Sequence, residues 1–87
     1  MAELSVDLVA ADRKVWSGSA VRISAPSTLG QIGIMAGHTP LIATLKPGKV
    51  SVTTQDGVVF VAQVMSGFVS VDDNLVTLVA HEIIPVT

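Results

Sequence analysis

The sequence has no cysteine, no tyrosine and few charged residues, which occupy 14 % of its 87 positions. Without cysteine the domain has no disulfides, and the two histidines, His38 and His81, lack a spacing that would hold a structural metal. A chain of this length has room for one core, so we treat residues 1–87 as a single domain. Such a domain buries only about 60 to 65 per cent of the surface that its unfolded chain exposes. Because 49 % of the residues are nevertheless apolar, we expect part of the surface to meet another protein.

The sequence also has no cluster of basic residues. Its net charge is −2, and its five lysines and arginines are spread along the chain with only Arg13 and Lys14 adjacent. A protein that binds nucleic acid neutralises runs of phosphates with a basic patch, and none is present here. Nucleic acid is therefore not an expected partner.

The longest uncharged stretch, residues 23–45, has the length of a membrane span but not its chemistry. It contains Pro26, Pro40 and three glycines, which would break a helix and leave polar groups in hydrocarbon. The N-terminus carries Glu3 and Asp7 and has no basic-then-apolar layout of a signal peptide. We expect no insertion into the bilayer, and the lack of cysteine and of an export signal fits the cytoplasm.

Apolar and polar residues alternate with period two along most of the chain, the pattern of half-buried strands. The segments with this pattern or an extended character are 4–10, 15–18, 20–25, 40–45, 50–53, 58–64, 67–71 and 75–80. Turns are expected at 12–14, at 46–49 as a type II turn, at 56–57 as a two-residue hairpin loop, and at 72–74. No segment has apolar residues at helical spacing. The pattern predicts an all-β fold, a β-sandwich of nine or ten short strands.

No group of residues suggests catalysis. His38 is a lone loop histidine with no acid close by in sequence, so a hydrogen-bonding turn residue is the favoured interpretation. Four of the seven carboxylates lie in predicted turns, where aspartate serves the backbone. The glycines of Gly30-Gln31-Ile32-Gly33 have neither a following helix nor a lysine to hold phosphate. We predict no catalytic residue, no cofactor and no metal.

Two other function classes remain open at this point. One is a carrier domain of the biotinyl or lipoyl type, for which Lys46 and Lys49 are the only lysines at a hairpin tip. The other is a stand-alone β-sandwich module that binds sugar or peptide through Trp16. Core packing is the competing interpretation of that tryptophan.

The order of the landmarks is more specific than the composition. The run Gly30-Gln31-Ile32-Gly33-Ile34, then Gly37-His38-Thr39-Pro40-Leu41, then Leu45-Lys46-Pro47-Gly48, with Trp16-Ser17-Gly18 before and Ser66-Gly67-Phe68 after, resembles the epsilon subunit of F-type ATP synthases. The resemblance covers residues 4–82. It implies a flattened β-sandwich of about ten strands, a non-catalytic central-stalk subunit that joins the gamma subunit to the c-ring, and a peripheral location on the cytoplasmic side of the membrane.

The resemblance also implies contact residues. It assigns Thr28, Leu29, Gly30, Gln31 and Ile32 to the c-ring, and His38, Thr39, Pro40 and Leu41 to gamma. We further expect special backbone geometry at five turn glycines, which are Gly33, Gly37, Gly48, Gly57 and Gly67.

The chain departs from the family pattern at several points. Neutral Gln31 replaces the usual acid, Ala36 replaces a frequent proline, and Ser66-Gly67 replaces a glycine pair. Many family members continue into a C-terminal helical hairpin, which can inhibit ATP hydrolysis and in some members binds ATP. These 87 residues contain no such hairpin, so we expect no ATP binding by this chain.

Overall fold

A computed structural model describes residues 3–86, and in that range it contains ten β-strands and no helix. The strands are β1 (Leu4–Ala10), β2 (Arg13–Ala20), β3 (Arg22–Ser27), β4 (Gly30–Met35), β5 (Leu41–Leu45), β6 (Gly48–Thr53), β7 (Val59–Val64), β8 (Gly67–Asp72), β9 (Leu75–Ala80) and β10 (Ile83–Pro85). This confirms the prediction of an all-β sandwich of about ten short strands.

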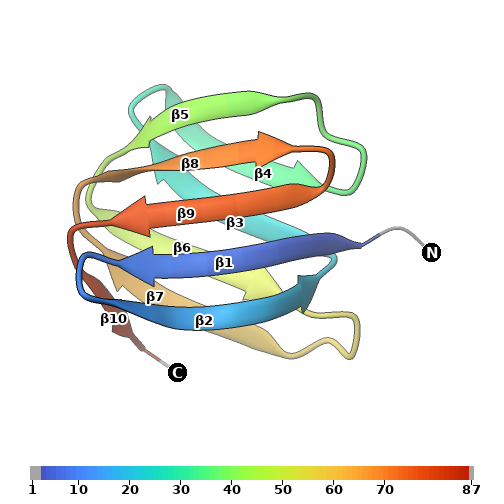
Figure 1. The fold of residues 1–87 in the computed structure, drawn as a ribbon, viewed down its shortest axis with the longest axis horizontal. Helices are drawn as coiled ribbons and strands as arrows, with labels where there is room; N and C mark the ends of the chain where they lie inside the picture. Colours follow the sequence, from blue (N-terminus) through green and yellow to red (C-terminus); the bar gives the residue numbers. More distant parts are fainter. Residues whose placement is uncertain (1–2, 87) are drawn as a thin grey trace.

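The strands form two layers (Figure 1). The nearer layer in the figure has the order β5-β8-β9-β1-β2, and the farther layer has the order β4-β3-β6-β7-β10. All neighbours are antiparallel except β1 and β9, which run parallel from the pair Ser5 and Leu75 to the pair Ala10 and Ala80. The layers are joined where the end of β3 crosses to β5 and Ser27 pairs with Leu45. The whole is thus one sheet folded upon itself.

The core lies between the layers and follows the alternation of the sequence. In β1, Leu4, Val6, Leu8 and Ala10 are buried, whereas the residues between them face outward. Large side chains buried in the same way come from most other strands: Ile23, Ile34, Leu45, Val50, Val52, Val64, Val69, Leu78 and Ile83. Each buried Leu, Ile or Val stabilises the fold by about 1.5–3 kcal/mol relative to an exposed one.

Trp16 closes the side of the sandwich where β2 and β7 are not hydrogen-bonded. Its ring stacks on Phe60 of β7 with centroids 5.9 Å apart and an angle of 20° between the planes. Gly18 lies under the indole, since a Cβ at that position would stand 3.1 Å from the Trp16 ring. The tryptophan therefore packs against the core, which removes the support for a sugar-binding surface built on it.

Three turns differ from the prediction. The turn expected at 12–14 lies at residues 11–12, since Arg13 and Lys14 already belong to β2. The loop between β6 and β7 spans residues 54–58 rather than 56–57, because Thr54 N–H donates to Val58 O at 2.9 Å and Gly57 N–H donates to Thr54 O at 3.0 Å. The prediction of a type II turn at residues 46–49 is wrong, since Gly48 is not among the residues with positive φ that such a turn needs. Gly48 is instead required by contact, because a Cβ there would lie 2.9 Å from Pro26 Cγ.

Candidate partner-binding surfaces

The turn between β3 and β4 contains the first of the residues assigned to a c-ring contact. Ser27, fully buried, fixes this turn through its hydroxyl, which donates to Gly30 O at 2.7 Å and accepts from Leu29 N–H at 3.1 Å. Gly30 completes the turn with φ 117°, a conformation open to glycine. The side chain of Leu29 is 88 % exposed as a result. The turn presents a single apolar side chain to the outside, next to exposed Thr28.

The other two residues of this set lie at the start of β4 and differ in orientation. Gln31 is exposed, and its side-chain amide donates to Ser24 Oγ at 2.6 Å. Ile32 is half-buried and packs against the core. Gln31 therefore belongs to the exposed surface of the turn, while Ile32 serves mainly to seal the space between the layers.

The connection from β4 to β5 holds the residues assigned to gamma. His38 N–H donates to Met35 O at 3.1 Å, and His38 Nδ1 lies 2.7 Å from Thr39 O. Gly37, with φ 88°, donates its N–H to Asn74 Oδ1 at 2.8 Å, which ties this connection to the turn between β8 and β9. The histidine thus contributes to a turn, as the sequence suggested. Thr39 and Pro40 are exposed, whereas Leu41 is half-buried against the core.

The two sets of residues lie at opposite ends of the sandwich. Figure 1 shows the β3–β4 turn at one end and the β4–β5 connection at the other, with β4 running between them. The structure therefore does not bring the two sets together into one site. It gives the molecule two separate exposed ends connected by a packed body.

The five predicted turn glycines fall into three groups. Gly37 and Gly57 have φ values of 88° and 86°. Gly48 and Gly67 are required by close approach, since a Cβ at Gly67 would collide with the backbone of β9. Gly33 is a correction: it lies inside β4 paired with Ser24, its φ is not positive, and a Cβ there would meet nothing within 4 Å. It is a strand residue, and only the alternation around it could have revealed this.

The outer face of the nearer layer carries exposed apolar residues that the sequence did not single out. Ile42 of β5 is 77 % exposed, and Phe68 of β8 and Leu75 of β9 are also exposed. Phe68 lies opposite Thr44 and Val79 in the neighbouring strands. Since period two places alternate residues on opposite faces, the sequence could name these residues but not say which of the two faces was solvent.

One carboxylate on this face has a perturbed pKa. The Ser17 hydroxyl donates to Asp7 Oδ1 at 2.8 Å, and Lys14 Nζ lies 3.5 Å from the same oxygen. The hydrogen bond from Ser17 is the main cause that lowers the pKa of Asp7, partial desolvation opposes it, and the charge of Lys14 adds to the lowering. The carboxylate is held in its charged form, which suits an ion pair and not a general acid.

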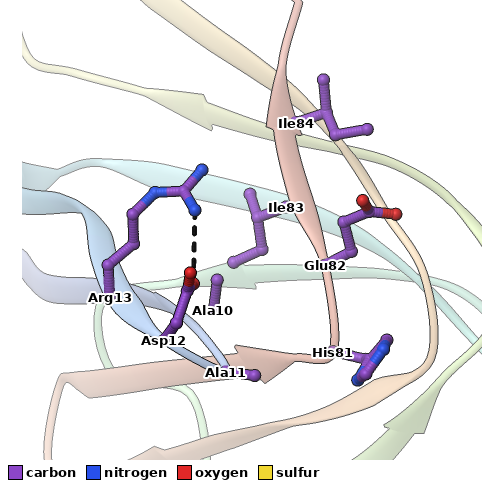
Figure 2. Close-up of a pocket in the computed structure, with 8 residues that line it drawn as sticks. All are labelled: Ala10, Ala11, Asp12, Arg13, His81, Glu82, Ile83 and Ile84. Carbon is purple, nitrogen blue, oxygen red and sulfur yellow. Dashed lines mark hydrogen bonds and ion pairs between the residues drawn. The ribbon is translucent and has the colours of Figure 1, made fainter.

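A hollow of about 380 Å³ lies between the β1–β2 turn and the segment that leads into β10 (Figure 2). Arg13 and Asp12 form an exposed ion pair of 3.2 Å on one side of it. Ile83 points toward Ala10, while the His81 and Glu82 side chains lie on the far side of the strand. These polar groups do not converge on a common point. Within residues 3–86 no three His, Asp or Glu side chains group closely enough to hold a metal ion. No helix in that range is long and apolar enough to cross a membrane.

Comparison with known proteins gives these surfaces a context. The ATP synthase epsilon chain of Streptomyces avermitilis is 52 % identical over 80 residues, which are 92 % of this chain and 64 % of that protein. The epsilon chain of Rhodococcus jostii is 49 % identical over 82 residues, 93 % of this chain and 67 % of the relative. The epsilon chain of Micrococcus luteus is 48 % identical over 80 residues, which are 92 % of this chain and 88 % of that protein. This chain thus spans just under two thirds of the length of the Streptomyces relative.

Solved structures share the fold. A chain in the mitochondrial ATP synthase of Euglena gracilis, a structure of OSCP, F1 and c-ring, superposes with a TM-score of 0.92 at 24 % identity, over 98 % of this chain and 54 % of that one. A chain from the central stalk and c-ring of the Tetrahymena thermophila mitochondrial ATP synthase superposes with a TM-score of 0.77 at 17 % identity. The superposition covers 92 % of this chain and 64 % of that one. The family model for the ATP synthase delta/epsilon chain β-sandwich domain matches residues 3–86. The chain therefore belongs to the ATP synthase delta/epsilon family, and residues 3–86 correspond to the β-sandwich domain of that family.

Proposed function

We propose that this chain is an epsilon-type rotor subunit that joins the gamma subunit to the c-ring of an F-type ATP synthase. In this role it passes rotation from the ring to gamma during ion-driven ATP synthesis and makes or breaks no bond itself. It is peripheral, on the cytoplasmic side of the membrane. The observation that carries the proposal is the family match over residues 3–86, together with epsilon chains about half identical to this one. A carrier or sugar-binding role has no comparable support.

The physical argument concerns stiffness and surface. A joint that transmits torque needs a body that does not deform, and a close-packed sandwich in which each strand is hydrogen-bonded to a neighbour supplies it. Two interfaces of roughly 800 Å² each would cover about a third of this chain's surface of 4799 Å². The exposed apolar residues at the β3–β4 turn and on the outer face of the nearer layer fit such extensive coverage.

The assignment of residues within this role is also part of the proposal. The ring contact consists of Thr28, Leu29, Gly30 and Gln31, supported from inside by Ile32. The gamma contact includes His38, Thr39, Pro40 and Leu41. Leu29 is the expected centre of the ring contact. An 88 % exposed leucine on a tightly fixed turn has much apolar area to bury on binding, and its backbone has little conformational freedom to lose. Neutral Gln31 can donate or accept a hydrogen bond there but supplies no charge.

The test is reconstitution of the complete enzyme. Membranes that hold the synthase depleted of its own epsilon chain are supplemented with the 87-residue chain, and ion-driven ATP synthesis and binding to gamma are measured. We expect binding to gamma and restored coupling. Leu29→Ser should weaken attachment to the ring by at least ~tenfold, while Val58→Ser, a matched change at a 60 % exposed residue of the β6–β7 loop, should not. A chain that binds neither gamma nor the ring would refute the proposal.

A further inference from the structure

Four strands lie at an edge of a layer: β2, β4, β5 and β10. β5 is joined to β3 only at the pair Leu45 and Ser27, where the two layers meet. Of the other three edges, two are protected. β10 is three residues long and ends in Pro85. β2 begins with the charged residues Arg13 and Lys14, and its pairing with β1 is interrupted by a register shift. Short length, charge, proline and bulges are the features that keep edge strands from pairing with other chains. Both edges are therefore protected against pairing with a further strand.

The third edge strand, β4, has none of these protections. It is six residues long, its sequence GQIGIM contains no charge and no proline, and its pairing with β3 runs without a register shift. Within residues 3–86 no strand other than β3 pairs with it. β4 is therefore an unprotected sheet edge.

The direction of the backbone groups of β4 follows from those of β3. Lys46 N–H donates to Pro26 O at 3.1 Å, so the carbonyl of Pro26 points toward β5 and away from β4. Backbone direction alternates along a strand, so Ser27, Ala25 and Ile23 point toward β4 instead. Their partners there are Gly30, Ile32 and Ile34.

The remaining residues of β4, namely Gln31, Gly33 and Met35, direct their N–H and C=O groups toward the free edge. The carbonyl of Met35 accepts from His38 N–H. The groups that remain at the free edge are therefore the N–H and C=O of Gln31 and Gly33 and the N–H of Met35. All three residues are exposed. Gly33 stands at the centre, and a Cβ built there would meet nothing within 4 Å, so no neighbouring side chain covers the strand on that face.

We infer that an extended segment of the gamma subunit adds to this free edge of β4 as an eleventh strand. The inference rests on the proposed function and specifies how its gamma contact is made. The main-chain groups of Gln31, Gly33 and Met35 supply the hydrogen bonds, and side chains of the partner segment supply the specificity.

Gamma is the partner because of where β4 lies. The strand runs along the side of the sandwich, from the β3–β4 turn to the connection that holds His38, Thr39 and Pro40. The ring contact is proposed at the tip of that turn, so the side of the body is left to the stalk subunit. An added strand would also be continuous with the proposed gamma residues that follow β4 in the chain.

The geometry defines the chemistry of the partner segment. Its inward side chains would cover half-buried Ile32 and Leu41, which favours aliphatic residues at alternate positions. On the outer face the space beside Gly33 favours a large or aromatic side chain, as edge glycines do when paired across strands. A segment of about five or six residues, roughly 17–20 Å long, matches the strand.

Amide hydrogen exchange, read residue by residue by NMR, is the first test. In the isolated 87-residue chain the amides of Ile32 and Ile34 should be protected by β3, whereas that of Gly33 should exchange rapidly. Addition of purified gamma should slow exchange at Gly33 by ~100-fold or more. Slowing that instead grows with the concentration of the chain alone would identify a second copy as the occupant and overturn the assignment to gamma.

A proline substitution is the second test. Gly33→Pro removes the free-edge donor without removing a hydrogen bond to β3, and proline is tolerated at edges whose N–H faces solvent. Ser19→Pro on β2 is the matched control. Ser5 N–H donates to Asn74 O at 2.8 Å and so points toward β9, which means that its partner Ser19 also points away from the β1–β2 ladder.

The outcomes separate the inference from the proposed function. We expect Gly33→Pro to lower the affinity for gamma at least ~tenfold with a melting temperature like that of Ser19→Pro, and Ser19→Pro to bind as the unmodified chain does. Binding of gamma with unchanged exchange at Gly33 and no loss in Gly33→Pro would overturn the edge pairing and leave the rotor role intact. Absence of any complex with gamma would overturn both.

Discussion

Removal of the Ser27 hydroxyl tests the argument that one buried group fixes the turn at the ring end. In Ser27→Ala the backbone groups of Leu29 and Gly30 each lose a hydrogen bond, because the hydroxyl accepts from the first at 3.1 Å and donates to the second at 2.7 Å. Each net hydrogen bond contributes about 1 kcal/mol, and a partly buried group left unpaired costs at least that much. We therefore expect the free energy of unfolding to fall by about 2 kcal/mol, and the melting temperature by about 8–16 °C for a domain of this size.

Urea unfolding followed by tryptophan fluorescence is a direct assay, since Trp16 is the only tryptophan of the chain and stacks on Phe60 in the folded state. Thr28→Ala is the matched control: the neighbouring residue is exposed, and its change should stay within about 0.5 kcal/mol. Ser27→Ala should also weaken the proposed attachment to the ring, because Leu29 is no longer held at the tip of the turn. A loss of stability below about 0.5 kcal/mol in Ser27→Ala would show that water replaces the hydroxyl and that the turn is fixed by its backbone.

Two further predictions concern single positions, and a third concerns the whole chain. Gly67→Ala should destabilise the fold by about 3 kcal/mol or prevent folding, because its Cβ would collide with the backbone of β9, whereas Gly33→Ala should change the melting temperature little; similar losses in both would contradict the geometry. The pKa of Asp7 is lowered in the folded state, so its contribution to stability is present above the unfolded pKa of about 4 and is lost as pH falls through the folded pKa. Ser17→Ala removes the main cause of this lowering and should therefore reduce the loss of stability in acid, measured as the melting temperature from about pH 7 to about pH 2. Calorimetry of the 87-residue chain with ATP should give no binding heat, and a measurable affinity would contradict this.

Much of the fold could be predicted because most strands alternate cleanly and are separated by recognisable turns. In the segment that contains β1, Leu4, Val6, Leu8 and Ala10 occupy every second position, and all four are buried. Asp73 and Asn74, the two non-glycine residues with positive φ among those described, form the tight turn between β8 and β9 that the sequence indicated. Local signals sufficed because each hairpin is specified by its own residues.

The strands that sequence reasoning missed carry weaker local signals. β4 contains two glycines and begins with one, so its alternation of Ile32 and Ile34 resembled a flexible loop. β10 has only three residues and forms because β7 offers a free edge to it. Where Gly48 is concerned, the deciding contact is with Pro26, 22 positions earlier, and no local turn rule contains that information.

The contact residues were less predictable than the fold, for a physical reason. Period two shows that Ile42 and Ala43 face opposite sides, but only the packing of the two layers decides which is inside. The ring and gamma residues came from a family resemblance, and the structure shows that they occupy opposite ends. It adds the hydrogen bonds of the buried Ser27 hydroxyl and the unpaired edge of β4, neither of which has a local signal in the sequence.

The uncharged stretch from residue 23 to residue 45 brings these observations together. It folds into β3, β4 and β5, so burial explains the absence of charge at inward positions such as Ile23 and Ile34. Burial does not explain it at outward positions, because Leu29, Met35 and Ile42 are between 60 % and 88 % exposed, where water would accept a charge at no cost to folding. A protein that has to keep other chains away would place lysine or glutamate at such positions on an edge strand. Their absence is better explained by a surface that is covered in the rotor proposed above, where a charge would have to be desolvated.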